Sequence, residues 1–93
     1  MTERKSALLV LGAGAWGTAL GSRIASDSGV TVKLWSRSER LATIINESRV
    51  NQDYLPEIQL SENLTASSNL PGLISWLKNE PDDTLKCLLL ATP

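Results

Sequence analysis

ALLVLGAGAWG, residues 7–17, is the most informative part of this chain for predicting its fold. It joins a continuous apolar run, residues 7–11, to a G-x-G-x-x-G motif, residues 12–17. A short continuous apolar run is typical of a strand that is buried on both faces of a parallel sheet. From Ala15 to about Asp27 the pattern becomes helical. The stretch therefore predicts a strand, a glycine loop and a helix in direct succession, which is the context that gives this motif meaning.

Each glycine of the motif has a predicted physical task. Gly12 permits the tight turn, Gly14 lets the backbone approach a pyrophosphate, and Gly17 lets the helix pack close to the strand. The free N–H groups at the start of the helix then bind phosphate with the help of the helix dipole. We therefore expect a dinucleotide at this loop, and the alternative is a glycine-rich turn without a ligand. A P-loop is excluded, because no Gly-Lys-Ser/Thr follows.

The predicted first helix has one apolar stripe. Trp16, Leu20 and Ile24 lie four residues apart, so we expect this stripe to face the sheet. Ser28-Gly29 is expected to end the helix, since glycine is common just after a helix. Trp16 allows two interpretations: it packs against the cofactor, or it only anchors the helix to the sheet.

The rest of the chain repeats the alternation of strands and helices. Alternating apolar residues predict a second strand at residues 30–35, and Ser36 or Ser38 is suited to cap the helix that follows. A short third strand is expected at residues 64–67, followed by a helix with Asn69 as its cap and Pro71 in its first turn. Residues 47–61 are polar and irregular.

The last predicted element is a second fully buried strand at residues 85–91, with Cys87 as a small buried hydrophobic residue. The order strand-helix-strand-helix-strand-helix-strand predicts a parallel sheet with right-handed crossovers and helices on both faces. The expected fold class is thus α/β, a Rossmann-type doubly wound parallel sheet truncated after the fourth strand. Residues 1–93 are expected to form one incomplete NAD(P)-binding domain.

The residue at the end of the second strand indicates which cofactor is used. NAD-specific proteins usually place Asp or Glu about 20 residues past the motif, to hold the ribose 2′-hydroxyl. This chain has Ser36-Arg37 there, and no carboxylate before Glu39. A guanidinium pairs with a 2′-phosphate, so Arg37 favours NADP(H) or the use of both cofactors. The alternatives are an Arg37 that stacks on the adenine and one that is merely solvated.

Composition excludes several other chemistries. The chain has 93 residues, 42% of them hydrophobic and 20% charged, so it reads as one small globular domain. With no His and a single Cys, a zinc site is not expected, and a His-based triad is impossible. The lone Cys cannot form an internal disulfide, which suits the cytoplasm. A net charge of -1 favours neither nucleic acid nor an anionic membrane as partner, and no run is long enough for membrane insertion.

Four segments together resemble one family. They are residues 11–20 (LGAGAWGTAL), residues 34–37 (LWSR), the pattern R-x-N-x-x-Y-L-P at residues 49–56, and the terminal LLATP at residues 89–93. This set resembles the amino-terminal part of NAD(P)-dependent glycerol-3-phosphate dehydrogenase. The glycine motif alone would fit many oxidoreductases, whereas the four segments together are specific.

The resemblance implies a Rossmann domain followed by a helical substrate domain. It also implies interconversion of dihydroxyacetone phosphate and sn-glycerol 3-phosphate with NAD(P)H in the cytoplasm, feeding glycerophospholipid synthesis. By position, the cofactor contacts fall on Gly12, Gly14, Ala15, Trp16, Gly17 and Arg37. Ala15 departs from the family, which often has Ser there. The family's catalytic Lys has no match here, so this chain is expected to hold no catalytic residue and to be inactive by itself.

Two other functions fit parts of the sequence. One is a free-standing NADP(H)-binding sensor or partner-binding module, in which a partner covers the sheet edge at residues 85–91. The other is an S-adenosylmethionine-dependent methyltransferase, which shares the glycine-rich first turn but prefers an acid after the second strand. The roles of Arg49 and Asn51 stay open between a cofactor contact and a hydrogen bond from loop to sheet.

Overall fold

The structure, a computed structural model, describes residues 5–27 and 29–91. Its elements follow the predicted order: β1 (Ser6–Leu11), α1 (Ala15–Ala25), β2 (Val30–Trp35), α2 (Glu39–Ser48), β3 (Leu64–Ser67), α3 (Leu70–Asn79) and β4 (Leu85–Leu90). Helix α1 ends two residues earlier than expected. Ser28, predicted to help end that helix, lies outside the described residues, as do Thr92 and Pro93 of the terminal LLATP.

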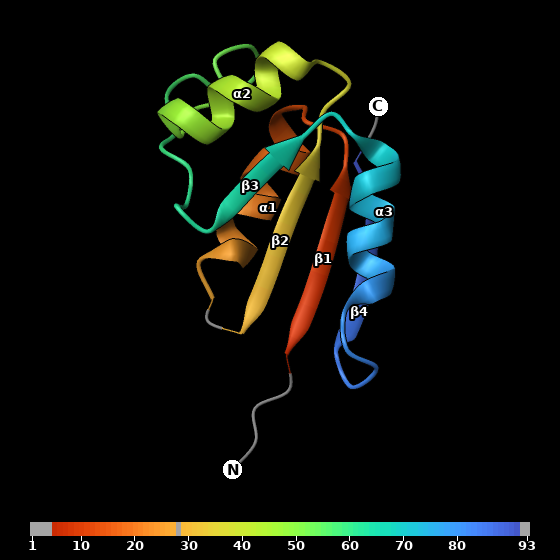
Figure 1. Cartoon of the computed structure of the whole chain (residues 1–93). Helices are drawn as coiled ribbons and strands as arrows, with labels where there is room; N and C mark the ends of the chain where they lie inside the picture. Colours follow the sequence, from red (N-terminus) through yellow and green to blue (C-terminus); the bar gives the residue numbers. More distant parts are fainter. Residues whose placement is uncertain (1–4, 28, 92–93) are drawn as a thin grey trace.

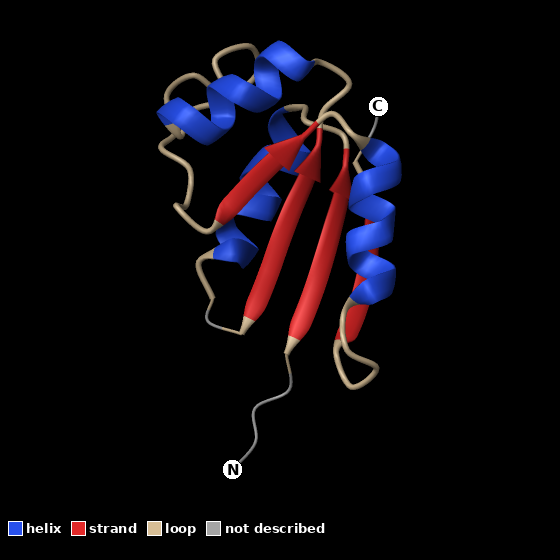
Figure 2. Cartoon of the chain, viewed as in Figure 1, coloured by secondary structure: helices blue, strands red, loops and turns tan. Residues whose placement is uncertain are grey.

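The four strands form one parallel sheet in the order β3-β2-β1-β4. Figure 2 shows the arrows of β1, β2 and β3 pointing the same way, with the helices outside the sheet. Helix α1 packs on one face, and α3 packs against β1 and β2 from the opposite face (Figure 1). The chain therefore winds from β1 outward to β3 and then crosses back to β4, which confirms the predicted doubly wound fold.

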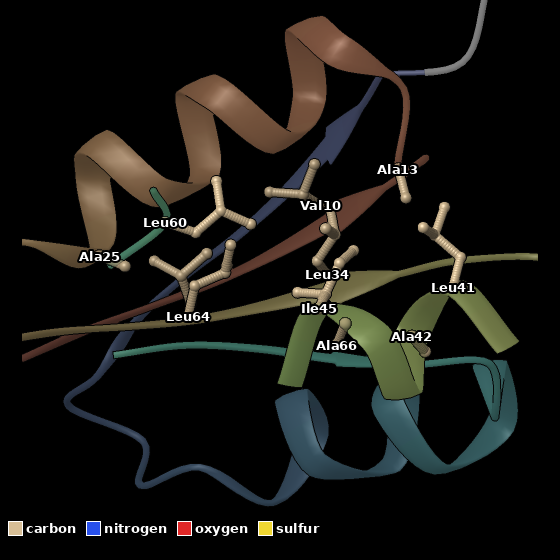
Figure 3. Close-up of a cluster of buried hydrophobic side chains, with 11 residues drawn as sticks. Val10, Ala13, Ala25, Leu34, Leu41, Ala42, Ile45, Leu60, Leu64 and Ala66 are labelled. Atoms are coloured by element: carbon tan, nitrogen blue, oxygen red, sulfur yellow. The ribbon is translucent and has the colours of Figure 1, made fainter. Parts of the chain in front are cut away.

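The main core lies between the sheet and helices α1 and α2 (Figure 3). Val10, Leu34 and Leu64 supply the sheet side, and Ile45 fills the centre from α2; all four are fully buried. Leu34 and Leu64 lie on the alternately buried face of their strands, whereas β1 buries residues on both of its faces. This core holds the carboxyl ends of β1 and β2 next to one another.

The predicted sheet-facing stripe of α1 is wrong for Trp16 and holds in part for Ile24, which is partly buried against the core. The face that is buried consists of Gly17, Gly21 and Ala25 together with Thr18, whereas Trp16 is 60% exposed. Small residues face the sheet because the helix comes very close to it. An ideal Cβ at Gly17 would lie 2.5 Å from the Gly12 carbonyl oxygen. Large side chains at this spacing would push the helix away from the strand.

Strand β4 is not buried as predicted. Leu85, Leu88 and Leu90 are 50%, 57% and 69% exposed, and Cys87 is also exposed. Within the described part of the chain, β4 pairs with β1 alone, and helices α1 and α3 pack mainly over β1 and β2. The apolar run thus formed a strand, but at the edge of the sheet, where few groups of residues 5–27 and 29–91 cover it.

No helix of the described residues combines the length and apolar character that crossing a membrane requires.

Candidate functional site

A pocket of about 670 Å³ lies at the carboxyl ends of β1 and β2. Ligands of open parallel sheets bind at this end, next to the point where the strand order reverses. The volume falls in the range of small-molecule sites. The pocket is lined by the loop after β1, the last residue of β2 and the turn that follows, one residue of α2, a segment before β3 and the residue after β4: Gly12, Ala13, Gly14, Trp35, Ser36, Arg37, Ser38, Leu41, Asp53, Tyr54 and Ala91.

The glycine loop forms the floor of this pocket. Gly12 has φ 125°, a backbone conformation that favours glycine, and its N–H donates to the Trp35 carbonyl over 3.1 Å. Gly14 has an ordinary extended conformation, and an ideal Cβ there would meet no atom within 4 Å. Gly14 is therefore not needed for the fold of this loop. The missing side chain leaves open space in the pocket, where a ligand can approach the backbone.

Helix α1 points its N-terminus toward the pocket without a side-chain cap. Gly14 is the N-cap residue, and no acidic residue lies in the first turn. In contrast, the Ser38 and Asn69 side chains cap α2 and α3 by accepting from the N–H groups of Leu41 and Gly72, each over 3.1 Å. The first N–H groups of a helix have no partner within the helix. At α1 they remain suited to a phosphate.

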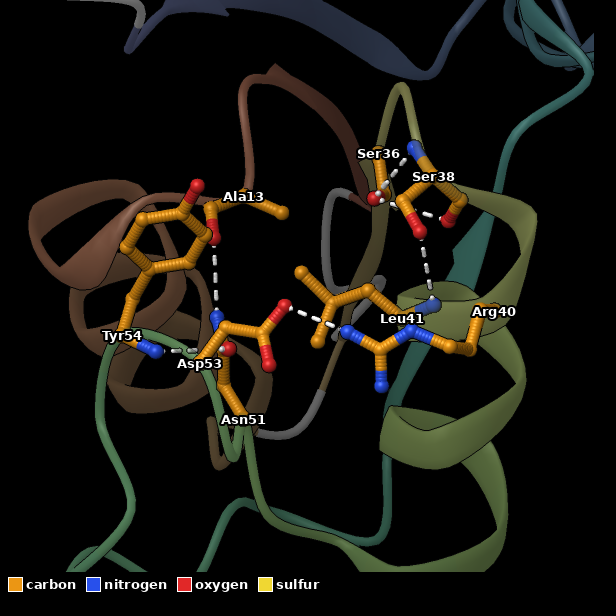
Figure 4. Close-up of polar contacts among 8 residues, drawn as sticks. All are labelled: Ala13, Ser36, Ser38, Arg40, Leu41, Asn51, Asp53 and Tyr54. Atoms are coloured by element: carbon orange, nitrogen blue, oxygen red, sulfur yellow. Dashed lines mark hydrogen bonds and ion pairs between the residues drawn. The ribbon is translucent and has the colours of Figure 1, made fainter.

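Arg37 is presented by a tight turn after β2. The buried Ser36 hydroxyl donates to the Ser38 carbonyl over 3.0 Å and accepts from the Ser38 N–H over 3.1 Å (Figure 4). The turn holds both flanking residues, and Arg37 between them is exposed and lines the pocket. Its guanidinium makes no ion pair within the described part of the chain. The fold thus brings Arg37 into one pocket with Gly12 and Gly14. A contact of these three residues with a cofactor stays a prediction.

The other three predicted site residues do not line the pocket. Gly17 is buried under the glycine loop, and Ala15 and Trp16 are exposed on the first turn of α1. The exposure of Trp16 contradicts the interpretation that it anchors the helix to the sheet. A contact of Ala15 or Trp16 with a cofactor stays a prediction.

Asn51 ties a distant segment to the glycine loop. Its side chain is fully buried, and its Nδ2 donates to the Ala13 carbonyl over 2.8 Å and to the Thr18 hydroxyl over 2.9 Å. Its Oδ1 accepts from the Tyr54 N–H over 3.2 Å (Figure 4). One amide group therefore joins the loop, the first turn of α1 and the segment before β3. It holds the loop in shape without lining the pocket.

Asp53 and Tyr54 line the pocket, yet sequence reasoning gave neither a role. Tyr54 is 57% exposed, and the Asp53 carboxylate forms an ion pair of 2.8 Å with Arg40 of α2. Both lie in the polar, irregular stretch 47–61, which has no periodicity from which a position could be predicted. The only signal in the sequence was the R-x-N-x-x-Y-L-P pattern that contains them.

Comparison with known proteins identifies the family. The protein-family model of the NAD-dependent glycerol-3-phosphate dehydrogenase N-terminus matches residues 7–76 of this chain. The chain belongs to this family. The matched range contains the glycine loop, the Arg37 turn and the Asn51 segment.

The glycerol-3-phosphate dehydrogenase relatives are much longer than this chain. The enzyme of Halorhodospira halophila is 47% identical over 75 residues, which are 77% of this chain and 22% of that protein. The enzyme of Corynebacterium glutamicum is 50% identical over 60 residues, covering 64% of this chain and 18% of the relative. Both relatives are named glycerol-3-phosphate dehydrogenase [NAD(P)+]. The chain thus spans about a fifth of the length of these relatives.

Solved glycerol-3-phosphate dehydrogenase structures share the fold. The enzyme of Coxiella burnetii superimposes with a TM-score of 0.67 at 34% identity, covering 76% of this chain and 22% of the other. The Plasmodium falciparum enzyme gives a TM-score of 0.69 at 25% identity, covering 94% and 25%.

In this chain, Arg49 connects a loop to the sheet. Arg49 adopts the left-handed conformation with φ 60° at the end of α2, and its guanidinium donates to the carbonyls of Leu64 and Ser61. Its own carbonyl accepts from the Leu60 N–H over 2.7 Å. Of the two roles left open by the sequence, the structure therefore supports the hydrogen bond from loop to sheet.

Proposed function

We propose that this chain is the cofactor-binding part of a glycerol-3-phosphate dehydrogenase and binds NADP(H) or NAD(H) in the pocket above the glycine loop. One observation carries the proposal. A Gly14 without a Cβ, the uncapped N-terminus of α1 and the unpaired Arg37 guanidinium face one pocket within the described residues. These are the three groups that a phosphorylated dinucleotide needs.

Each residue of the site would contact a particular part of the cofactor. Gly12 and Gly14 would let the backbone approach the pyrophosphate, and the N–H groups that begin at Ala15 would bind its charge. Gly17 keeps α1 close to the loop, and Trp16, exposed on the same first turn, would contact the cofactor from outside the pocket lining. Arg37 would pair with a 2′-phosphate on the adenosine ribose. When bound, the nicotinamide supplies the hydride chemistry, and the protein supplies the geometry.

We further propose that the substrate site lies outside this chain. Its substrates would be dihydroxyacetone phosphate and glycerol 3-phosphate, and the enzyme would work in the cytoplasm. Hydride transfer to a carbonyl needs a group that delivers a proton to the oxygen. Within the described part of the chain, no Lys and no His lines the pocket. We therefore assign residues 1–93 to an NAD(P)-binding domain that holds no catalytic residue and is inactive by itself.

Gly14→Ala tests the phosphate cradle. The added methyl meets no protein atom within 4 Å, so the free energy of unfolding should change by less than about 0.5 kcal/mol. The methyl occupies the space of the pyrophosphate, so we expect NADPH affinity to fall at least about tenfold, which is roughly 1.4 kcal/mol. Urea unfolding and a fluorescence titration of the same sample measure both quantities. Unchanged affinity would argue against a pyrophosphate at this loop.

Arg37→Ala tests the recognition of the 2′-phosphate. Loss of a charge-assisted hydrogen bond costs about 1.5–3 kcal/mol, so NADPH should bind roughly 10–100-fold more weakly while NADH changes little. Arg23→Ala is the matched control, because it removes the same charge from the last turn of α1, far from the pocket. An equal loss for both cofactors would mean that Arg37 stacks on the adenine instead. A folded chain that binds neither cofactor would overturn the proposed function.

A further inference from the structure

The pocket is lined by a carboxylate, that of Asp53, whose position there was not predicted from the sequence. Of the residues that line it, Arg37 and Asp53 carry opposite charges, and the other nine are uncharged. Arg37 directly follows β2, whereas Asp53 lies in the segment between α2 and β3. No acid directly follows β2 in the chain, so the tertiary structure supplies the carboxylate that was absent at that position.

The position of Asp53 is set by hydrogen bonds on both sides of it. Asn51, two residues earlier, is held by the Ala13 carbonyl, and the N–H of Leu55 donates to the Asn51 carbonyl over 2.8 Å. The Tyr54 N–H donates to the Asn51 side chain over 3.2 Å. These bonds close a tight turn with Asp53 at its tip. The turn is fastened to the glycine loop, so the carboxylate keeps its place beside the pocket.

Arg40 partly neutralises this carboxylate. Its Nη2 donates to Asp53 Oδ2 over 2.8 Å, and the two side chains are 64% and 38% exposed. Figure 4 shows the Asp53 carboxylate reaching from its turn toward Arg40 on α2. An exposed ion pair of this kind is weak and is screened by salt. The negative charge beside the pocket is therefore reduced but not removed.

The two forms of the cofactor meet this carboxylate differently. A 2′-phosphate is negatively charged at neutral pH, so it is attracted by Arg37 and repelled by Asp53. A 2′-hydroxyl carries no charge and can donate a hydrogen bond to a carboxylate, which is how acids select NAD in this type of fold. The balance between Arg37 and Asp53 thus acts on the one chemical group that distinguishes the cofactors.

We propose that Asp53 and Arg40 determine how strongly this chain prefers NADP(H) over NAD(H). Asp53 opposes the 2′-phosphate and favours the 2′-hydroxyl, and Arg40 sets the size of this effect by pairing with Asp53. The inference rests on the proposed function, since it requires a dinucleotide in the pocket. Asp53 is a specificity residue here, and Arg40 is a positioning residue that acts through it.

Three variants of the 93-residue chain test this inference. Asp53→Asn keeps the shape and removes the charge, so NADPH should bind about 2–5-fold more tightly and NADH equally or more weakly. Arg40→Gln leaves Asp53 unpaired, so NADPH should bind about 2–5-fold more weakly. When Arg40→Gln is added to Asp53→Asn, the affinity for NADPH and for NADH should stay as it is in Asp53→Asn alone. Adenosine 2′,5′-bisphosphate, which carries the 2′-phosphate without the nicotinamide, should follow NADPH.

The control is Asp83→Asn, which removes an exposed acid from the turn before β4. That turn lies at the amino end of the strands, away from the pocket (Figure 1). An unchanged ratio of NADPH to NADH affinity in Asp53→Asn would overturn the inference, as would an equal gain in Asp83→Asn. Neither result would affect the proposed function. A folded wild-type chain that binds neither cofactor would overturn both.

Discussion

Gly17→Ala is expected to lower the free energy of unfolding by about 1–3 kcal/mol, which is the usual cost of overpacking a buried contact. The new Cβ would lie 2.5 Å from the Gly12 carbonyl oxygen and 2.7 Å from the Ala91 Cβ. The first of these contacts is with backbone, which cannot turn aside as a flexible side chain does. Helix α1 must therefore move away from β1. Urea unfolding followed by tryptophan fluorescence measures the loss, and NADPH affinity should fall with it.

Gly21→Ala is the matched control for this prediction. Gly21 lies one turn later on the same buried face of α1, but its nearest neighbours would be 3.6 Å from a new Cβ. This is ordinary van der Waals contact, and Ala is a better helix former than Gly by up to about 1 kcal/mol. We expect Gly21→Ala to be neutral or stabilising. Equal effects at the two glycines would contradict the close approach of α1 to the loop.

Asn51→Ala is expected to lower the free energy of unfolding by about 2–4 kcal/mol. The change leaves the Ala13 carbonyl and the Thr18 hydroxyl without their shared donor in a fully buried place. Each unsatisfied buried group costs about 1–3 kcal/mol. The glycine loop also loses its tie to the segment before β3, so NADPH affinity should fall as well. Urea unfolding and a cofactor titration at low urea separate these two effects.

Two variants sharpen this prediction. The ionised carboxylate introduced by Asn51→Asp still accepts from the Tyr54 N–H but cannot donate to the Ala13 carbonyl, so it should destabilise as much as Asn51→Ala. Asn46→Ala removes two side-chain hydrogen bonds, both to Ala66 of β3 and both 2.8 Å long, whereas Asn51→Ala removes three. It should lower stability while NADPH affinity stays unchanged. A loss of affinity as large as that of Asn51→Ala would show that the glycine loop has no special dependence on Asn51.

The helices and strands could be predicted well from local sequence patterns, because each pattern involves residues that are close together in the chain. Ser38 and Asn69 cap their helices as expected, because a cap bonds to an N–H three residues away. The glycine loop could also be predicted, because its motif directly follows the apolar run of β1 in the chain. Burial was harder to predict: the apolar run in β4 indicates a strand, but whether neighbours cover it depends on elements far away in the chain.

The parallel α/β fold, the glycine loop at the end of β1 and the place of Arg37 after β2 could all be predicted from the amino-acid sequence. These features follow from periodicity, from the conformational freedom of Gly12 and from the short distance along the chain between a strand and the turn that ends it. The tertiary packing settled that Gly21, and not Trp16, faces the sheet, and that Asn51 bonds to Ala13, 38 residues away. It also placed Asp53 in one pocket with Arg37, because a contact across the fold depends on how the layers pack and leaves no periodic trace in the chain.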